Sequence, residues 1–206
     1  SSSFGLLNQN KANSLVDYSI KLGITRFDTG VNYGNWTSQP LLGLCLEKHL
    51  RSNREKFTIT SKAGTHSKSW VEASKNFSPE YIENMIERSI SELKCNYLDK
   101  FYLHGPSLND LNISGLLKKL KILKKSGKIR SIGVNTHKLD LMKKISSGYF
   151  EEIDRILIDY NLIQQDRNEI FKSCKKNNIG ISAGTVLCQG LLINSPIKQI
   201  ISKRNL

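Results

Sequence analysis

The sequence predicts an α/β protein of the (β/α)8 TIM-barrel class, incomplete, with about seven βα units. Short runs of β-branched and aromatic residues alternate with longer stretches of helical periodicity, and Gly, Asn or Ser closes each pair. A polar side chain follows nearly every predicted strand. No Gly/Ser-rich or Pro-rich stretch divides the 206 residues, so a single domain over residues 1–206 is expected.

The predicted strands are rich in β-branched and aromatic residues and are bounded by turn-forming residues. They are Phe4–Leu6, Ile24–Phe27, Phe57–Ser61, Lys100–Leu103, Ile129–Val134, Arg155–Asp159 and Gly180–Ala183.

The predicted helices fall between these strands. The best-defined one has Ser78 as its N-cap, Pro79 at the first helical position and Glu80 in the first turn. Its apolar residues recur every three or four positions, as in a helix lying on a sheet. The full set is Asn13–Leu22, Gln39–Leu50, Pro79–Leu93, Ser114–Ser126, Lys138–Ser147, Arg167–Asn177 and Pro196–Ser202.

The polar residues at the strand ends decide between a closed barrel and an open, doubly wound sheet. In an open sheet, ligands gather at one switch point. Side chains from many consecutive strands converge on one ligand only when the sheet closes on itself. Such barrels need eight strands and about 250 residues. The eighth strand and the C-terminal loop are therefore expected to be missing or to lie beyond Leu206. The strand-end residues are Asp28, Lys62, His104, Asn135, Thr136, Asn161 and Thr185.

The chain is strongly basic, with 31 Lys and Arg against 18 Asp and Glu and a formal net charge of +13. Such a charge is typical of proteins that bind nucleic acid or anionic lipid. The lysines, however, occur in pairs along helix faces, without a recognition motif or interleaved aromatic residues. We therefore expect no nucleic-acid partner, and a basic rim that favours an anionic cofactor or substrate.

The four cysteines are far apart and have no metal-ligand spacing, which argues against a zinc site or a disulfide framework and predicts a reduced, cytoplasmic location. The four histidines show no ligand pattern either, so no metal is expected. No apolar run approaches the length of a membrane span, so no membrane partner is expected.

Four ionisable residues make up the candidate catalytic site: Asp28, Tyr33, Lys62 and His104. Asp28 follows one strand, and a short glycine-containing loop returns Tyr33 to the same point. Lys62, at the end of the next strand, pairs with Asp28. An ammonium beside a phenol favours the phenolate, which makes Tyr33 a candidate general acid. His104 could orient a substrate carbonyl oxygen. Each residue alone also has a purely structural explanation, as a rim ion pair, a packing ring or a neutral histidine.

Several motifs resemble those of the aldo-keto reductases over almost the whole chain. They are the FDTxxxYG run at Phe27–Gly34, Leu42-Gly43, Thr60–Lys62, Leu98–Pro106 and Gly127–Val134. The resemblance implies a TIM barrel that binds NADPH, with NADH as an alternative, and has no Rossmann motif. It also implies an aldehyde or ketone substrate, hydride transfer from the nicotinamide, and protonation of the substrate oxygen by Tyr33.

The resemblance further implies a set of cofactor contacts. The chain departs from the family pattern at Val134, Leu157, Gly184 and Val186, where the family has Ser, Gln, an aromatic residue and Pro. These differences weaken one side of the expected nicotinamide pocket. The implied contacts are Gly5, Asp28, Asn135, Thr136, Thr185, Leu187, Gln189 and Gly190.

Two alternatives stay open at this point. The altered pocket could belong to a non-catalytic barrel that binds nucleotide or another protein, or the chain could be a fragment of a longer reductase. The sequence names neither the natural substrate nor the oligomeric state.

Overall fold

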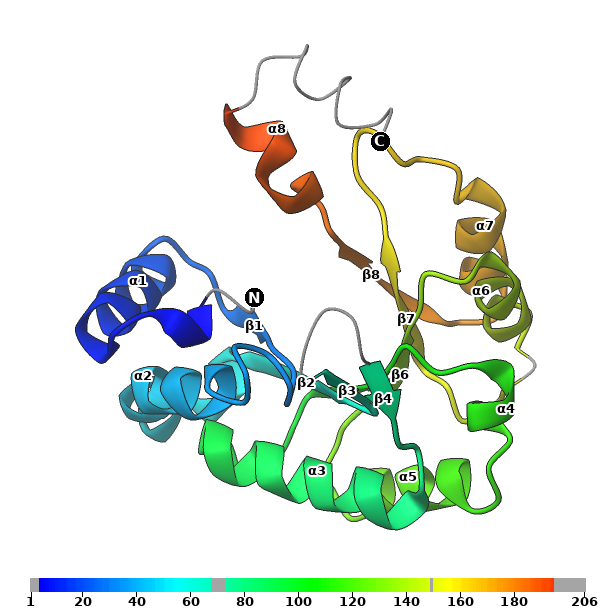
Figure 1. Cartoon of the computed structure of the whole chain (residues 1–206), viewed down its shortest axis with the longest axis horizontal. Helices are drawn as coiled ribbons and strands as arrows, with labels where there is room; N and C mark the ends of the chain where they lie inside the picture. The colour runs from blue at the N-terminus through cyan, green and yellow to red at the C-terminus, as the bar shows by residue number, and fades with distance from the viewer. Residues whose placement is uncertain (1–3, 68–72, 149, 195–206) are drawn as a thin grey trace. The chain divides into compact units, whose positions relative to one another are not determined.

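The computed structural model describes residues 4–67, 73–148 and 150–194. Its backbone forms two compact units, Ser1–Asn135 and Thr136–Leu206 (Figure 1). The expected single domain over residues 1–206 remains a prediction.

The first unit contains four parallel strands in the order β1-β2-β5-β6. Residue pairs in register are Asp28 with Thr60, Lys62 with Tyr102, and His104 with Asn135. All four strands were predicted, with boundaries that differ by at most three residues. Their bounds are β1 Arg26–Asp28, β2 Thr58–Ala63, β5 Lys100–His104 and β6 Ile132–Asn135.

Helices cover this sheet on its outer side, where α3 and α5 lie side by side in Figure 1. The predicted N-cap of α3 is confirmed, because Ser78 Oγ accepts a hydrogen bond from Tyr81 N at 3.4 Å. The buried residues Ile82, Ile86 and Leu93 face inward. The helical segments are η1 Phe4–Leu6, α1 Gln9–Lys21, α2 Ser38–Ser52, η2 Arg54–Lys56, α3 Pro79–Leu93, α4 Leu108–Leu111 and α5 Leu116–Lys125.

The predicted strand Phe4–Leu6 is wrong: these residues form a single 3-10 turn, with Leu7 N bonded to Phe4 O at 3.1 Å. Gly5 explains the difference. A Cβ on Gly5 would lie 2.4 Å from Thr37 Oγ1. The segment packs closely on the loop before α2, and this contact overrides the β propensity of three residues.

Helices α2 and α3 also approach closely, at Gly43. A Cβ there would lie 2.0 Å from Glu92 O and 2.9 Å from Leu93 Cα. The absence of a side chain at Gly43 therefore sets the spacing of the two helices.

A short antiparallel hairpin, β3 Thr65–Ser67 with β4 Ala73–Lys75, was not predicted. It follows β2 and is anchored beside the end of β5. Thr65 Oγ1 donates to His104 O, and Lys75 Nζ donates to Gly105 O at 2.5 Å. The hairpin therefore supports the backbone that carries His104.

The second unit contains the parallel pair β7 and β8, with Asp159 opposite Gly184. Both strands were predicted. The predicted helix Pro196–Ser202 lies outside the described residues. The elements are α6 Leu139–Ser146, β7 Arg155–Asp159, α7 Asn168–Lys176, β8 Gly180–Gly184, η3 Cys188–Gly190 and α8 Leu191–Asn194. Across the described part of the chain, no helix combines the length and the apolar character needed to span a membrane.

Candidate active site

Four polar residues lie at the carboxyl ends of the strands of the first unit. Asp28, His104 and Asn135 are the last residues of β1, β5 and β6, and Lys62 is the last but one of β2. The strands are parallel, so these residues share one rim of the sheet.

Lys62 is a buried ammonium at this rim, with a side chain only 2% exposed. Its Nζ forms an ion pair with Asp28 Oδ1 and donates a hydrogen bond to Thr29 O at 2.7 Å. Two acceptors compensate the cost of burying the charge. The Asp28 side chain is 48% exposed, so the pair is buried at the lysine and open to solvent at the carboxylate.

Tyr33 is brought to Lys62 by the loop between β1 and α2. Val31 N donates to Lys62 O at 3.0 Å, and Tyr33 N donates to Gly30 O at 3.0 Å. The first bond docks the loop onto β2, and the second closes a turn within the loop. The Lys62 Nζ then lies 5.0 Å from the centroid of the Tyr33 ring. A Cβ on Gly30 would lie 3.4 Å from Tyr33 Cε1, so the ring packs over the Gly30 backbone.

His104 lies on another side of the same ring. The Tyr33 and His104 ring centroids are 5.9 Å apart, with an angle of 76° between the ring planes. This is an edge-to-face contact. The structure thus brings together the four residues that the sequence predicts as the catalytic set. We call these residues the tetrad: Asp28, Tyr33, Lys62 and His104.

The same loop holds polar atoms that the tetrad does not use. Among the described residues, Thr29 Oγ1 and Asn32 Oδ1 are buried and have no hydrogen-bond partner. Asn135, predicted to contact the cofactor, is 5% exposed at the end of β6. Buried amide and hydroxyl groups at a sheet rim fit a ligand that carries a carboxamide, because each can exchange one hydrogen bond with it.

Gly5 lies in the 3-10 turn, and its carbonyl oxygen accepts a hydrogen bond from Thr37 Oγ1 at 2.7 Å. Its close packing on the Tyr33 loop is sufficient to require glycine. Its role as a cofactor contact stays a prediction.

At the strand ends of the second unit, Asp159 joins two side chains. Its carboxylate accepts a hydrogen bond from Thr185 Oγ1 at 2.6 Å and contacts His137 Nδ1. Sequence reasoning did not find this cluster, although both Asp159 and His137 stand at predicted strand ends. Thr136, also predicted to contact the cofactor, is 2% exposed and accepts a hydrogen bond from Lys138 N at 3.1 Å.

The other predicted cofactor residues follow β8. Leu187 is 51% exposed, and Gly190 has φ +94°, a conformation that favours glycine. Gln189 belongs to η3. Their contacts with a cofactor stay predictions.

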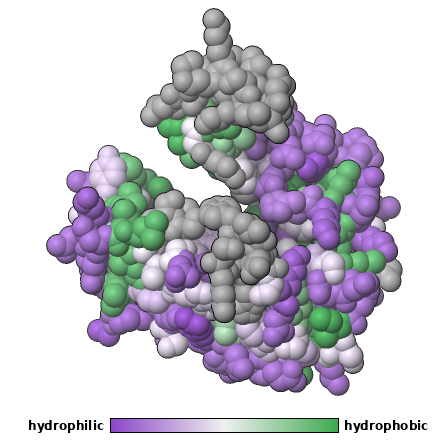
Figure 2. All heavy atoms as spheres, viewed as in Figure 1, coloured by the Kyte–Doolittle hydropathy of each residue, from purple (hydrophilic) through white to green (hydrophobic). Residues whose placement is uncertain are grey.

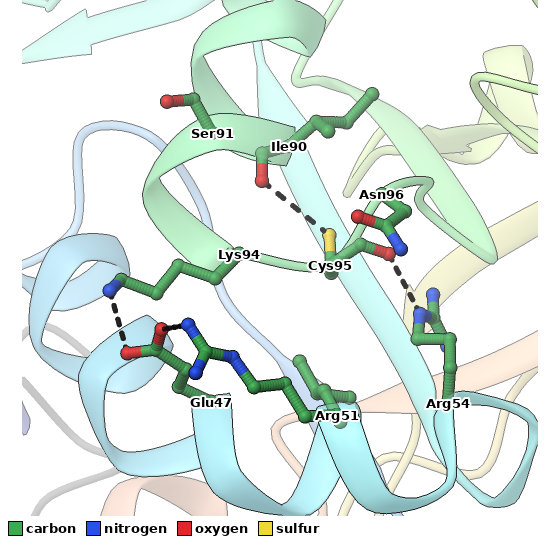
Figure 3. A pocket seen from close by; sticks show the side chains of 9 residues that line it. Glu47, Arg51, Arg54, Ile90, Ser91, Lys94, Cys95 and Asn96 are labelled. Atoms are coloured by element: carbon green, nitrogen blue, oxygen red, sulfur yellow. Dashed lines mark hydrogen bonds and ion pairs between the residues drawn. The ribbon is translucent and has the colours of Figure 1, made fainter.

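The first unit has two cavities of interest: one is lined by no residue of the tetrad, and the other adjoins Asp28. Figure 3 shows one of about 380 Å³ near the C-terminal ends of α2 and α3. Its cations Arg51 and Lys94 both pair with Glu47, at 2.5 and 2.7 Å. A smaller recess of about 280 Å³ adjoins Asp28 and is otherwise mostly apolar. Figure 2 shows apolar side chains gathered over α1 on the viewed face.

Within the described residues, no group of three or more His, Cys, Asp or Glu could hold a metal ion.

The cysteines differ in accessibility, and this predicts their reactivity. Cys95, at the cavity of Figure 3, is 1% exposed, and burial raises the pKa of its thiol to about 11. Burial also raises the pKa of Cys45 and Cys174. Iodoacetamide under native conditions should therefore modify Cys188 alone, because Cys188 is partly exposed. Intact mass and peptide mapping would measure this, and comparable labelling of Cys95 would contradict it.

Comparison with known proteins identifies the family. The sequence profile of the Aldo/keto reductase family matches residues 2–203. The chain is 26% identical over 195 residues to "Uncharacterized oxidoreductase YqkF" of Bacillus subtilis, covering 93% of this chain and 60% of the relative. It is 25% identical to "Aldo-keto reductase yakc [NADP(+)]" of Schizosaccharomyces pombe, covering 92% and 56%. The chain thus spans little more than half the length of these relatives.

Solved structures show the same fold. "Aldo-keto reductase AKR11C1" from Bacillus halodurans superposes with a TM-score of 0.78 at 22% identity, covering 92% of this chain and 61% of that one. A "putative aldo-keto reductase" from Pseudomonas aeruginosa gives a TM-score of 0.74 at 25% identity, covering 89% and 69%. This likeness confirms the predicted fold class, an incomplete (β/α)8 barrel. The chain belongs to the aldo/keto reductase family.

Proposed function

We propose that the chain carries the catalytic residues of a nicotinamide-dependent oxidoreductase that interconverts a carbonyl compound and its alcohol. The observation that supports this most strongly is the position of Tyr33. Its ring contacts the buried Lys62 ammonium and the His104 imidazole together. A structural ion pair between Lys62 and Asp28 has no need of a phenol and an imidazole beside it.

Each member of the tetrad then has one role. Tyr33 donates a proton from its hydroxyl to the substrate oxygen during reduction and removes it during oxidation. The Lys62 ammonium stabilises the phenolate that remains after donation. Asp28 holds the ammonium in place through the ion pair. His104 donates a hydrogen bond to the substrate oxygen and orients it toward Tyr33.

The cofactor in this proposal is NADP(H), with NADH as a possible substitute. A relative named for NADP(+) and the family itself support this choice. When bound, the nicotinamide supplies the hydride. The residues proposed to hold it are the predicted contacts Gly5, Asp28, Asn135, Thr136, Thr185, Leu187, Gln189 and Gly190. Of these, Asn135 offers a buried amide at the end of β6, and an amide can both donate to and accept from the nicotinamide carboxamide.

Calorimetry and turnover on the same preparation would test the proposal. We expect binding of NADPH, together with oxidation of NADPH when small aldehydes or ketones are added. Binding without turnover over a broad substrate panel would favour the non-catalytic alternative. Absence of both would contradict the proposal.

A further inference from the structure

The loop that carries Tyr33 continues through an uncommon backbone conformation. Gly34, Asn35 and Trp36 have φ values of +60°, +52° and +70°. Three consecutive residues are thus left-handed, and two of them carry a side chain. L-residues visit this region singly and seldom, and a bulky residue there is a real outlier. Such a conformation persists only where its surroundings enforce it.

The contact that accounts for Trp36 comes from helix α3. The guanidinium carbon of Arg88 lies 4.7 Å from the centroid of a Trp36 ring, a cation–π distance. The Arg88 side chain is 40% exposed, and its Nε donates to Glu92 Oε1 at 2.6 Å. Glu92 therefore fixes the guanidinium in the position from which it covers the indole.

Two hydrogen bonds, one part-buried and one buried, connect Glu92 to the strand of Lys62. Gln39 Nε2 donates to Glu92 Oε2 at 2.9 Å, and Ser61 Oγ donates to Gln39 Oε1 at 2.5 Å. Gln39 is 1% exposed and Ser61 is 0% exposed. Ser61 directly precedes Lys62 on β2. Because successive side chains of a strand point to opposite faces, Ser61 faces the helices while Lys62 faces Asp28 and Tyr33.

The contacts form a closed path. It runs from β2 through Gln39 and Glu92 to Arg88, then to Trp36, and returns along the loop to Tyr33. We propose that Arg88 is a positioning residue, which clamps Trp36 and thereby holds Tyr33 in register with Lys62. This inference rests on the proposed function only for its kinetic consequence. The clamp itself is a structural claim.

The kinetic test replaces Arg88 with methionine, which keeps an unbranched apolar stem and removes the guanidinium group with its charge. We expect kcat to fall roughly tenfold, because a small displacement of a catalytic group carries a cost of this size. The KM for NADPH should stay within about twofold, since Trp36 and Glu92, the residues that Arg88 contacts, are not among the predicted cofactor residues. Arg88→Lys keeps a cation over the indole and should restore most of kcat.

The matched control is Arg51→Met. Arg51 forms an ion pair with Glu47 four residues away, as Arg88 does with Glu92. It lies in the last turn of α2, by the cavity of Figure 3, whereas Trp36 precedes the first turn of α2. Trp36→Leu gives an independent variant of the same clamp. It should match Arg88→Met, and combining the two should cost little more than either alone.

A fluorescence measurement tests the clamp without any turnover. The chain has two tryptophans, so Trp70→Phe leaves Trp36 as the one tryptophan, which can be excited selectively over the tyrosines. In that background, Arg88→Met should make Trp36 more accessible to acrylamide, and Arg51→Met should not. Unchanged quenching would overturn the proposal whether or not the protein is active. Changed quenching with a kcat equal to that of the control would overturn the positioning role alone. A wild type without turnover would refute the proposed function and leave the clamp to be judged by quenching.

Discussion

Replacing Tyr33 with phenylalanine is expected to lower kcat about a hundredfold or more, because general acid catalysis contributes at least that factor. The substitution removes one oxygen atom and keeps the ring that packs over Gly30 and against His104. The fold and the affinity for NADPH should therefore be preserved. Steady-state rates of NADPH oxidation, together with calorimetric affinities, would measure the separation of catalysis from binding.

Tyr18→Phe provides the matched control for this experiment. Tyr18 lies on α1, is 61% exposed and belongs neither to the tetrad nor to the predicted cofactor contacts. Removal of the Tyr18 hydroxyl should leave both kcat and the affinity for NADPH unchanged. If Tyr33→Phe were as active as Tyr18→Phe, Tyr33 could not be the proton donor.

The second large effect concerns stability and arises at Arg54. Its side chain is 12% exposed and forms an ion pair with Asp99, itself 14% exposed, at 2.8 Å. It also donates to the carbonyl oxygens of Cys95, Phe57 and Tyr97 at 2.7–2.8 Å. Arg54→Met should lower the free energy of unfolding by about 3 kcal/mol. The three carbonyl oxygens each lose a charged donor, and the half-buried Asp99 carboxylate keeps only Ile59 N, at 2.8 Å, and the more distant Arg130, at 3.4 Å.

Urea denaturation would measure this change, with Arg51→Met as the control. Arg51 is 79% exposed and forms only a surface ion pair on α2, which contributes little to stability. Its midpoint should match that of the wild type. Equal midpoints for Arg54→Met and Arg51→Met would show that the Arg54 network is not needed to hold the starts of β2 and β5 together.

Much of the fold could be predicted because its signals are local. The bounds of α3 are correct since Ser78, Pro79 and the apolar stripe all lie within one segment. The bounds of β7 are also correct, because Arg155–Asp159 is a compact β-branched run. The hairpin β3–β4 could not be predicted in this way. Its strands are polar, and bonds to His104 and Gly105 hold it, about thirty to forty residues away in sequence.

The candidate site also has a part that the sequence predicts and a part that it does not. The tetrad was predictable, because each member follows a recognisable strand and belongs to a motif. The Arg88–Trp36 contact and the Arg54–Asp99 pair were not, since a guanidinium gives no sequence signal for a partner about 50 residues away, 52 for Trp36 and 45 for Asp99. The positive φ of Trp36 was also invisible, because tryptophan has no preference for that conformation.

The central claim is that these strand ends support hydride transfer to a carbonyl carbon. The most direct test is to supply NADPH deuterated at the transferred position with an aldehyde substrate, and to analyse the alcohol by mass spectrometry. We expect one deuterium on the carbinol carbon with the wild type and very little labelled product with Tyr33→Phe. If the protein bound the cofactor but formed no labelled alcohol from any substrate of the panel, the assignment as a reductase would be contradicted.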